Sequence, residues 1–202
     1  MTTIVAGSLN ALVGSSVLTG VAADVVVIPT AAAFLGAAEV ALEVALALEP
    51  FASAVEALMV VDRSGAEDES IARRIAQADL VVLADGSPLH AKAVWRDSSV
   101  GAALAAAASL VAIGAVATTL GTVMIDPRGG APTIGLGYRR GVVLTTPAPP
   151  EQLSRTRRLY TGDESLVVVG ARGVLVESAG VWRVTQADDV EVINATGGSS
   201  LY

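Results

Sequence analysis

The residues SLVAIGAVATTL, at positions 109–120, combine a run typical of a buried strand with a corner of small side chains. Residues 109–115 are almost entirely apolar, as in a parallel strand that is covered on both faces. Gly114, Ala115 and Ala117 belong to the corner, and the pattern predicts that a helix begins there. In many α/β hydrolases such a corner presents a serine nucleophile, but these residues have no nucleophilic side chain.

Similar apolar runs precede this corner, at residues 24–30, 55–62 and 79–85. The segments that follow these runs have helical patterning: residues 31–48, a segment that ends near residue 78, and a segment that begins at residue 88. Ser64 and Glu67 have the spacing of a capping box, which predicts that the second helix begins there. The alternation predicts an α/β protein with three αβα layers around a doubly wound, mostly parallel sheet, as in flavodoxin.

The chain changes character after residue 125. Turn-forming residues dominate positions 126–141, and a short strand and a helix follow, at 141–147 and 149–159. Short apolar runs then come in close succession, at 165–171, 173–179, 181–185 and 189–194. They predict antiparallel strands at the C-terminal edge of the sheet. No linker divides the chain, so we expect residues 1–202 to form a single domain, with a frayed tail at 196–202.

Composition excludes several classes of function. The net charge is −7 and no basic stripe is present, which argues against binding to nucleic acid. The chain has no cysteine and a single histidine, His90, which excludes disulfides and multi-histidine zinc sites. We expect neither a metal nor a cofactor.

One stretch, residues 100–125, is uncharged and long enough to cross a bilayer. Its serine, threonines and glycines divide it into a helix end, a strand and a second helix. We therefore expect a globular, cytoplasmic protein without membrane contact.

The carboxyl ends of parallel strands commonly hold the ligand of an open α/β sheet. Two such ends are the corner described above and residues 84–90. Asp85, Gly86 and Ser87 predict a turn that either caps the next helix or binds a small anion at its N-terminus. Ser87 and His90 are three residues apart, so Ser87 either caps the helix or forms a catalytic pair with His90.

A second polar turn, DPRGG at residues 126–130, follows the corner. Asp126 and Arg128 either brace this turn through hydrogen bonds, or Arg128 holds the carboxylate of a ligand with two parallel hydrogen bonds. The second alternative points to a small carboxylate or a peptide as ligand.

GSPLH at 86–90, the small-residue corner and DPRGG at 126–130 together resemble the peptidase S51 family. This is the dipeptidase E and cyanophycinase group of the class I glutamine amidotransferase-like fold, here of an actinobacterial type. The resemblance covers nearly the whole chain and implies a Ser-His-acid triad in active members. Counted from DPRGG, it places the serine at Gly114, the histidine near 146–148 and the acid near 170–171. None of these positions carries the required side chain.

The sequence therefore supports two main hypotheses. In the first, the chain is a non-catalytic homologue (a pseudoenzyme) that acts as a binding or structural subunit, as a homodimer or with an active relative. In the second, it is a peptidase-like or amidohydrolase-like enzyme whose nucleophile has moved to Ser87, Thr118 or Thr119. A third hypothesis is a sensor that binds a small ligand in the former catalytic pocket, near Asp85 and Arg128.

Overall fold

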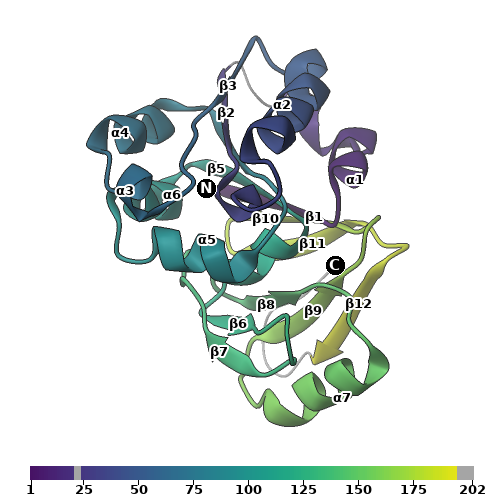
Figure 1. Cartoon of the computed structure of the whole chain (residues 1–202). Helices are drawn as coiled ribbons and strands as arrows, with labels where there is room; N and C mark the ends of the chain where they lie inside the picture. Colours follow the sequence, from purple (N-terminus) through teal and green to yellow (C-terminus); the bar gives the residue numbers. More distant parts are fainter. Residues whose placement is uncertain (21–23, 195–202) are drawn as a thin grey trace.

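A seven-stranded sheet forms the centre of the molecule (Figure 1). The computed structural model describes residues 1–20 and 24–194, so the predicted frayed tail at 196–202 lies outside the described residues. The strands of this sheet are β1 (Thr2–Ala6), β2 (Asp24–Ile28), β3 (Ala54–Ala57), β4 (Leu80–Leu83), β5 (Ser109–Ile113), β10 (Val174–Ser178) and β11 (Val181–Gln186). Their order is β11-β10-β1-β5-β4-β2-β3. Strands β1 to β5 are parallel, and β10 and β11 are antiparallel to their neighbours.

Helices cover both faces of this sheet, which confirms the predicted three-layer α/β architecture. The described helices are α1 (Leu9–Gly14), α2 (Ala37–Leu48), α3 (Arg63–Ala66), α4 (Glu69–Gln77), α5 (Pro88–Trp95), α6 (Ser99–Ala106) and α7 (Pro150–Leu159), with short 3₁₀ helices η1 (Ser16–Leu18), η2 (Thr30–Ala32), η3 (Glu49–Phe51) and η4 (Gly114–Thr119). Helix α7 lies away from this sheet (Figure 1). Leu12 of α1 and Val44 of α2 are buried against one face of the sheet. Trp95 of α5 and Leu104 of α6 are buried against the other face.

Strand β1 was not predicted from the sequence, yet it is an interior strand of the main sheet, between β10 and β5. Its register pairs Ile4 with Val111 of β5 on one side and with Val176 of β10 on the other. The segment is only five residues long and begins with two threonines. Its strand conformation depends on pairing with both neighbours, which a local pattern does not reveal.

Two predicted helix starts are wrong. The helix expected at 31–48 begins at Ala37, because residues 30–32 form a 3₁₀ turn and Gly36 precedes the helix with a positive φ of 83°. The capping box at Ser64 does not form, since Asp62 accepts a hydrogen bond from the Gly65 N–H at 2.9 Å and places Ser64 inside α3. A second aspartate, Asp68, caps the separate helix α4.

The C-terminal strands divide between two sheets. Strands β10 and β11 form the predicted antiparallel edge of the main sheet. The other two, β9 (Ser165–Val169) and β12 (Val190–Asn194), instead form a three-stranded sheet with β8 (Val142–Thr145). In that sheet β9 is parallel to β8 and antiparallel to β12. The DPRGG turn joins β6 (Val123–Ile125) to β7 (Pro132–Ile134) in a hairpin that was not predicted.

The long uncharged stretch is divided among several elements: α6, β5, η4 and β6 all contain part of residues 100–125. Within the described part of the chain, the structure contains no helix with the length and apolar character needed to cross a bilayer.

A buried arginine, Arg139, anchors the segment between β7 and β8 to the main sheet. Arg139 is only 5% exposed, and its guanidinium donates hydrogen bonds to the Thr3 hydroxyl of β1 and to the carbonyls of Ala105 and Ala107 at the end of α6. Burial lowers the pKa of Arg139 because desolvation disfavours its charged form. The arginine satisfies carbonyl groups that the helix end leaves without partners.

Candidate functional site

The candidate site lies where strands β4 and β5 end. The two strands are adjacent and parallel, with Leu83 opposite Ala112, so the residues after them emerge at the same edge of the sheet. Asp85 follows β4, and its Oδ1 accepts hydrogen bonds from two backbone N–H groups. These belong to Gly86, at 2.7 Å, and to Ala115 in the corner after β5, at 2.8 Å.

Gly114 lies directly beneath this carboxylate. Its φ is +64°, in the left-handed region that favours glycine, and a Cβ built on it would lie 2.2 Å from the Asp85 carboxyl group. The same constraint holds for Gly86, where a Cβ would lie 2.2 Å from the Ala31 carbonyl oxygen. A side chain at position 114, serine included, would overlap the Asp85 carboxylate in this arrangement.

Two convergent N–H groups on one oxygen are the arrangement that stabilises an oxyanion in acyl-transfer enzymes. Here the pair from Gly86 and Ala115 holds a carboxylate of the chain itself. Because Asp85 is exposed, its charge also remains in contact with solvent. The anion site is therefore formed and internally occupied.

The side chains of Ser87 and His90 do not pair with each other. The Ser87 hydroxyl accepts a hydrogen bond from the backbone N–H of His90 at 3.3 Å and caps α5, which begins with Pro88. The His90 ring turns elsewhere: its Nε2 lies 2.8 Å from the Val61 carbonyl oxygen, and the ring packs edge-to-face on Phe34. A proton from Ser87 therefore has no imidazole acceptor in this arrangement.

The two corner threonines are directed back into their own turn. The Thr118 hydroxyl donates to the Ala115 carbonyl at 3.0 Å, and the Thr119 hydroxyl donates to the Val116 carbonyl at 2.8 Å. Their exposed fractions are 2% and 0%. Both hydroxyls are thus buried and bound to backbone.

A small pocket of about 100 Å³ opens beside the corner. Ala115 and Thr118 line one side, and Thr146 and Ala148 line the opposite side, where the resemblance places a histidine. None of its lining residues is ionisable. The pocket therefore contains no general base for an attacking hydroxyl or water.

Gly170 and Ala171, where the resemblance places an acid, carry none, but the Asp189 carboxyl group lies beside Gly170. Gly170 donates its N–H to the Asp189 carbonyl at 2.8 Å, and a Cβ on Gly170 would lie 2.1 Å from the Asp189 carboxyl group. Ala171 accepts a hydrogen bond from the Ser8 hydroxyl. Asp189 binds the Arg172 N–H at 3.1 Å, so its carboxylate braces a loop.

Asp126 and Arg128 bind each other across the DPRGG turn. The Arg128 Nε and Nη2 donate to the two carboxylate oxygens at 3.1 and 2.8 Å, and the Arg128 N–H donates at 2.9 Å. The hydrogen bonds from the Arg128 side chain, and to a smaller extent the one from its backbone N–H, hold the pKa of Asp126 below its usual value. Only Pro127 of this turn lines the small pocket, so neither charged side chain reaches it.

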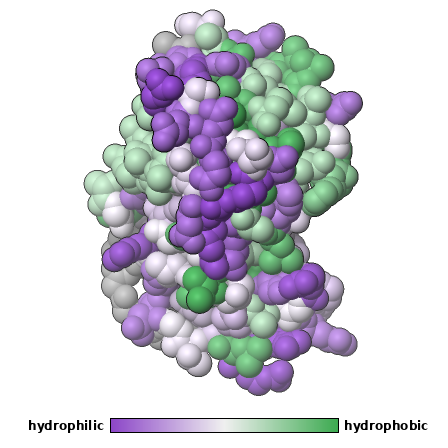
Figure 2. Space-filling view, turned by 60° about the vertical axis from the view of Figure 1, so that its left-hand side comes forward, coloured by the Kyte–Doolittle hydropathy of each residue, from purple (hydrophilic) through white to green (hydrophobic). Residues whose placement is uncertain are grey.

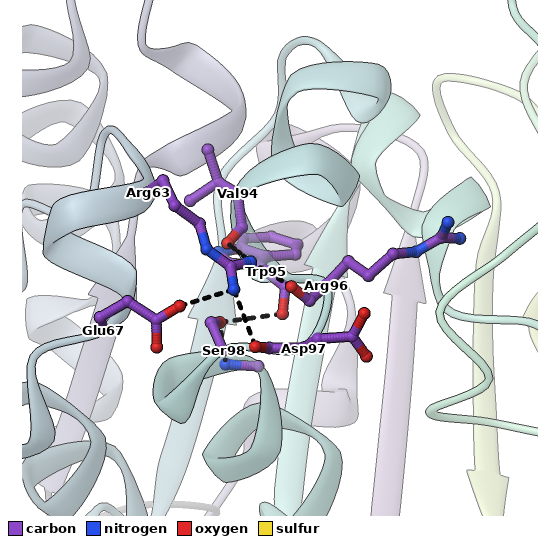
Figure 3. Close-up of polar contacts among 8 residues, drawn as sticks. Arg63, Glu67, Val94, Trp95, Arg96, Asp97 and Ser98 are labelled. Atoms are coloured by element: carbon purple, nitrogen blue, oxygen red, sulfur yellow. Dashed lines mark hydrogen bonds and ion pairs between the residues drawn. The ribbon is translucent and has the colours of Figure 1, made fainter.

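A larger pocket, about 520 Å³, lies elsewhere, beside the corner between α5 and α6. Arg63 braces this corner through the carbonyls of Val94, Arg96 and Asp97 and forms an ion pair with Glu67 (Figure 3). The side chains of Arg96 and Asp97 point away from Arg63 and line the pocket. Local sequence patterns do not reveal this pocket, because its other wall comes from the end of β7 and the segment that follows it.

Two hydroxyl side chains, Ser98 and Tyr138, line this larger pocket. The Ser98 hydroxyl is buried, donates to the Trp95 carbonyl at 2.9 Å and caps α6. The hydroxyl of Tyr138 has no partner among the described residues, but it is covered by α6, where a Cβ on Gly101 would lie 2.8 Å from it. Burial, with a contribution from Asp97, raises the pKa of Tyr138 far above its usual value, so the phenol stays protonated. Figure 2 shows a band of hydrophilic side chains across the middle of one face of the molecule.

Comparison with known proteins identifies a solved structure of similar fold. No family model and no curated protein matches the chain. The chain is similar to the crystal structure of a peptidase from an acI-B1 actinobacterium, with a TM-score of 0.76 and 17% sequence identity. The alignment covers 100% of this chain and 96% of that chain. At this identity the similarity shows a shared fold over the whole described chain.

Among the described residues, no cluster of three or more histidine, aspartate or glutamate side chains is placed so that it could hold a metal ion.

Proposed function

We propose that this chain is a non-catalytic member of the S51 serine peptidase family that it resembles, acting as a binding or structural subunit. One observation carries the proposal: the Asp85 carboxylate occupies the paired N–H donors beside Gly114. The solved peptidase of the same fold supports the choice of family.

The chemistry of a serine peptidase needs a hydroxyl, a base that deprotonates it and donors for the oxyanion. Gly114 has no side chain, and the facing residues Thr146 and Ala148 offer no base. The donors are present, but Asp85 fills them with a negative charge. An oxyanion that developed there would be repelled by this carboxylate instead of stabilised.

A relocated nucleophile is the competing function. Thr118 and Thr119 are buried, which leaves Ser87 as the partly exposed hydroxyl among the three candidates. Its oxygen caps α5, and the nearest histidine side chain is bound to the Val61 carbonyl. The geometry therefore favours a structural role for Ser87.

Reaction with a fluorophosphonate, read by intact-protein mass, tests the proposal. We expect no adduct on the folded protein under conditions that label trypsin completely. A stoichiometric adduct that Ser87→Ala, Thr118→Ala or Thr119→Ala abolishes, together with loss of peptide hydrolysis, would establish the relocated enzyme and overturn the proposal.

The proposal includes action in the cytoplasm, as a homodimer or in a heteromer with an active relative. Light scattering after size exclusion tests the homodimer. Co-purification with a catalytically competent relative tests the heteromer. A chain that remains a free monomer when this relative is present would contradict the heteromer.

A further inference from the structure

A third pocket lies beside Asp85, on the side of helices α1 and α2. Its volume is about 290 Å³, close to the lower limit of about 300 Å³ for small-molecule sites. It is separate from the small pocket beside the corner, because the two share no lining residue. The apolar part of its wall consists of Leu9, Leu35, Val40, Val44 and Ile113.

The ionisable residues that line this pocket are both acids, Asp85 and Glu43. Asp85 is held in one orientation, because its Oδ1 accepts two backbone hydrogen bonds. Its Oδ2 accepts none from the described residues, and Glu43 forms neither an ion pair nor a side-chain hydrogen bond with them. Two carboxylates at an apolar hollow thus lack a cationic partner within the described chain.

The chemistry of this wall selects a ligand class. An apolar body gains free energy by leaving water for the leucine and valine side chains. An ammonium group at the mouth interacts favourably with the two carboxylates, whereas a carboxylate or phosphate is repelled. The volume of about 290 Å³ accommodates an apolar group of the size of an amino-acid side chain.

We propose that this pocket binds a small amphiphilic cation, with the apolar group inside the pocket and the ammonium group against Asp85 and Glu43. The inference rests on the proposed function, since it uses Asp85 as a fixed binding carboxylate. Both a free amine and the amino terminus of a peptide present this chemistry.

Titration calorimetry with leucinamide at pH 6.5, where its amine is mostly protonated, tests the inference. We expect a dissociation constant of about 1 mM or below. N-acetyl-leucinamide, which keeps the apolar group and lacks the charge, is expected to bind at least about tenfold more weakly. Because both carboxylates are exposed, affinity is also expected to fall with added salt.

Three variants separate the charges from the fold. Asp85→Asn keeps an oxygen that accepts from both N–H groups and removes the charge, and Glu43→Gln removes the second charge. We expect each to weaken leucinamide binding at least about threefold, in line with partly exposed ion pairs. Glu39→Gln, on the same helix but outside the pocket, is the matched control and should leave the affinity unchanged.

The outcomes are distinct. Three results would each overturn the inference. The first is no leucinamide binding at a concentration 10-fold above the expected dissociation constant. The others are equally tight binding of the acetylated analogue, and equal effects of Glu39→Gln and Glu43→Gln on the affinity. Leu-Gly-Gly bound as tightly as leucinamide would assign the pocket to peptide amino termini, and weaker binding would assign it to free amines. Fluorophosphonate labelling, by contrast, overturns the proposed function whatever this titration shows.

Discussion

Replacing Gly114 by alanine probes the contact on which the proposed loss of catalysis depends. An L-residue at a φ of +64° costs roughly 1–2 kcal/mol. The added Cβ would lie 2.2 Å from the Asp85 carboxyl group, so the carboxylate must leave its two N–H donors. Because Asp85 is exposed, we assign only about 1–2 kcal/mol to the loss of these two hydrogen bonds. The expected destabilisation is therefore about 2–4 kcal/mol, or roughly 4–16 °C in Tm.

Urea unfolding of four proteins measures this coupling: the wild type, Gly114→Ala, Asp85→Ala and the double variant. In the Asp85→Ala background the alanine at position 114 meets no carboxylate, so only the backbone strain remains. The double variant should therefore be about 1–2 kcal/mol more stable than the sum of the single effects predicts.

Gly137→Ala is the matched control. Gly137 has a similar φ of +70°, but a Cβ there meets nothing within 4 Å. It should show the strain alone, about 1–2 kcal/mol. If the effects of Gly114→Ala and Asp85→Ala add within about 0.5 kcal/mol, and Gly114→Ala costs no more than Gly137→Ala, the reasoning about this contact is wrong.

Substitutions at three further residues test other parts of the structure. Arg128→Ala should raise the pKa of Asp126 toward its usual value, which carboxyl NMR can follow. In the wild type the lowered pKa of Asp126 stabilises the fold at pH values above the pKa of the unfolded state. This stabilisation is lost as the pH falls through the pKa of Asp126 in the folded state. Ser87→Ala should destabilise the protein by about 1 kcal/mol through loss of the α5 cap, whereas Ser87→Asp should retain the cap; chemical denaturation checks both. Arg139→Leu should cost about 3–5 kcal/mol, because several carbonyls and a hydroxyl lose a buried partner; an effect below 1 kcal/mol in the same assay contradicts that role.

Local patterns located the strands that are apolar over their whole length. Residues 24–28, 80–83 and 109–113 are buried on both faces of the sheet, and their continuous valine and leucine content identifies them without knowledge of their neighbours. The helix starts were less predictable where several caps compete. Asp62 and Asp68 each bind N–H groups two or three residues ahead, and this divided one predicted helix into two.

The candidate site was only partly accessible to sequence reasoning. That Asp85 and Gly114 lie at one edge of the sheet follows from the order of the strands. That the carboxylate binds the N–H of Ala115 depends on the register of β4 against β5, which no local signal encodes. The turn of the His90 ring toward Val61 likewise depends on a loop distant in the sequence.

By itself, the sequence determined the α/β class, the absence of thiol chemistry and the lack of nucleophilic side chains at residues 114–117, because composition and periodicity are properties of the chain alone. Only the tertiary structure decided that β1 lies inside the sheet, between β10 and β5, and that Asp85 occupies the donors beside Gly114. The physical reason is the same in both cases. Strand pairing and the hydrogen bonds of a carboxylate depend on which groups long-range packing brings within about 3 Å of each other, and a local pattern contains no information on that distance.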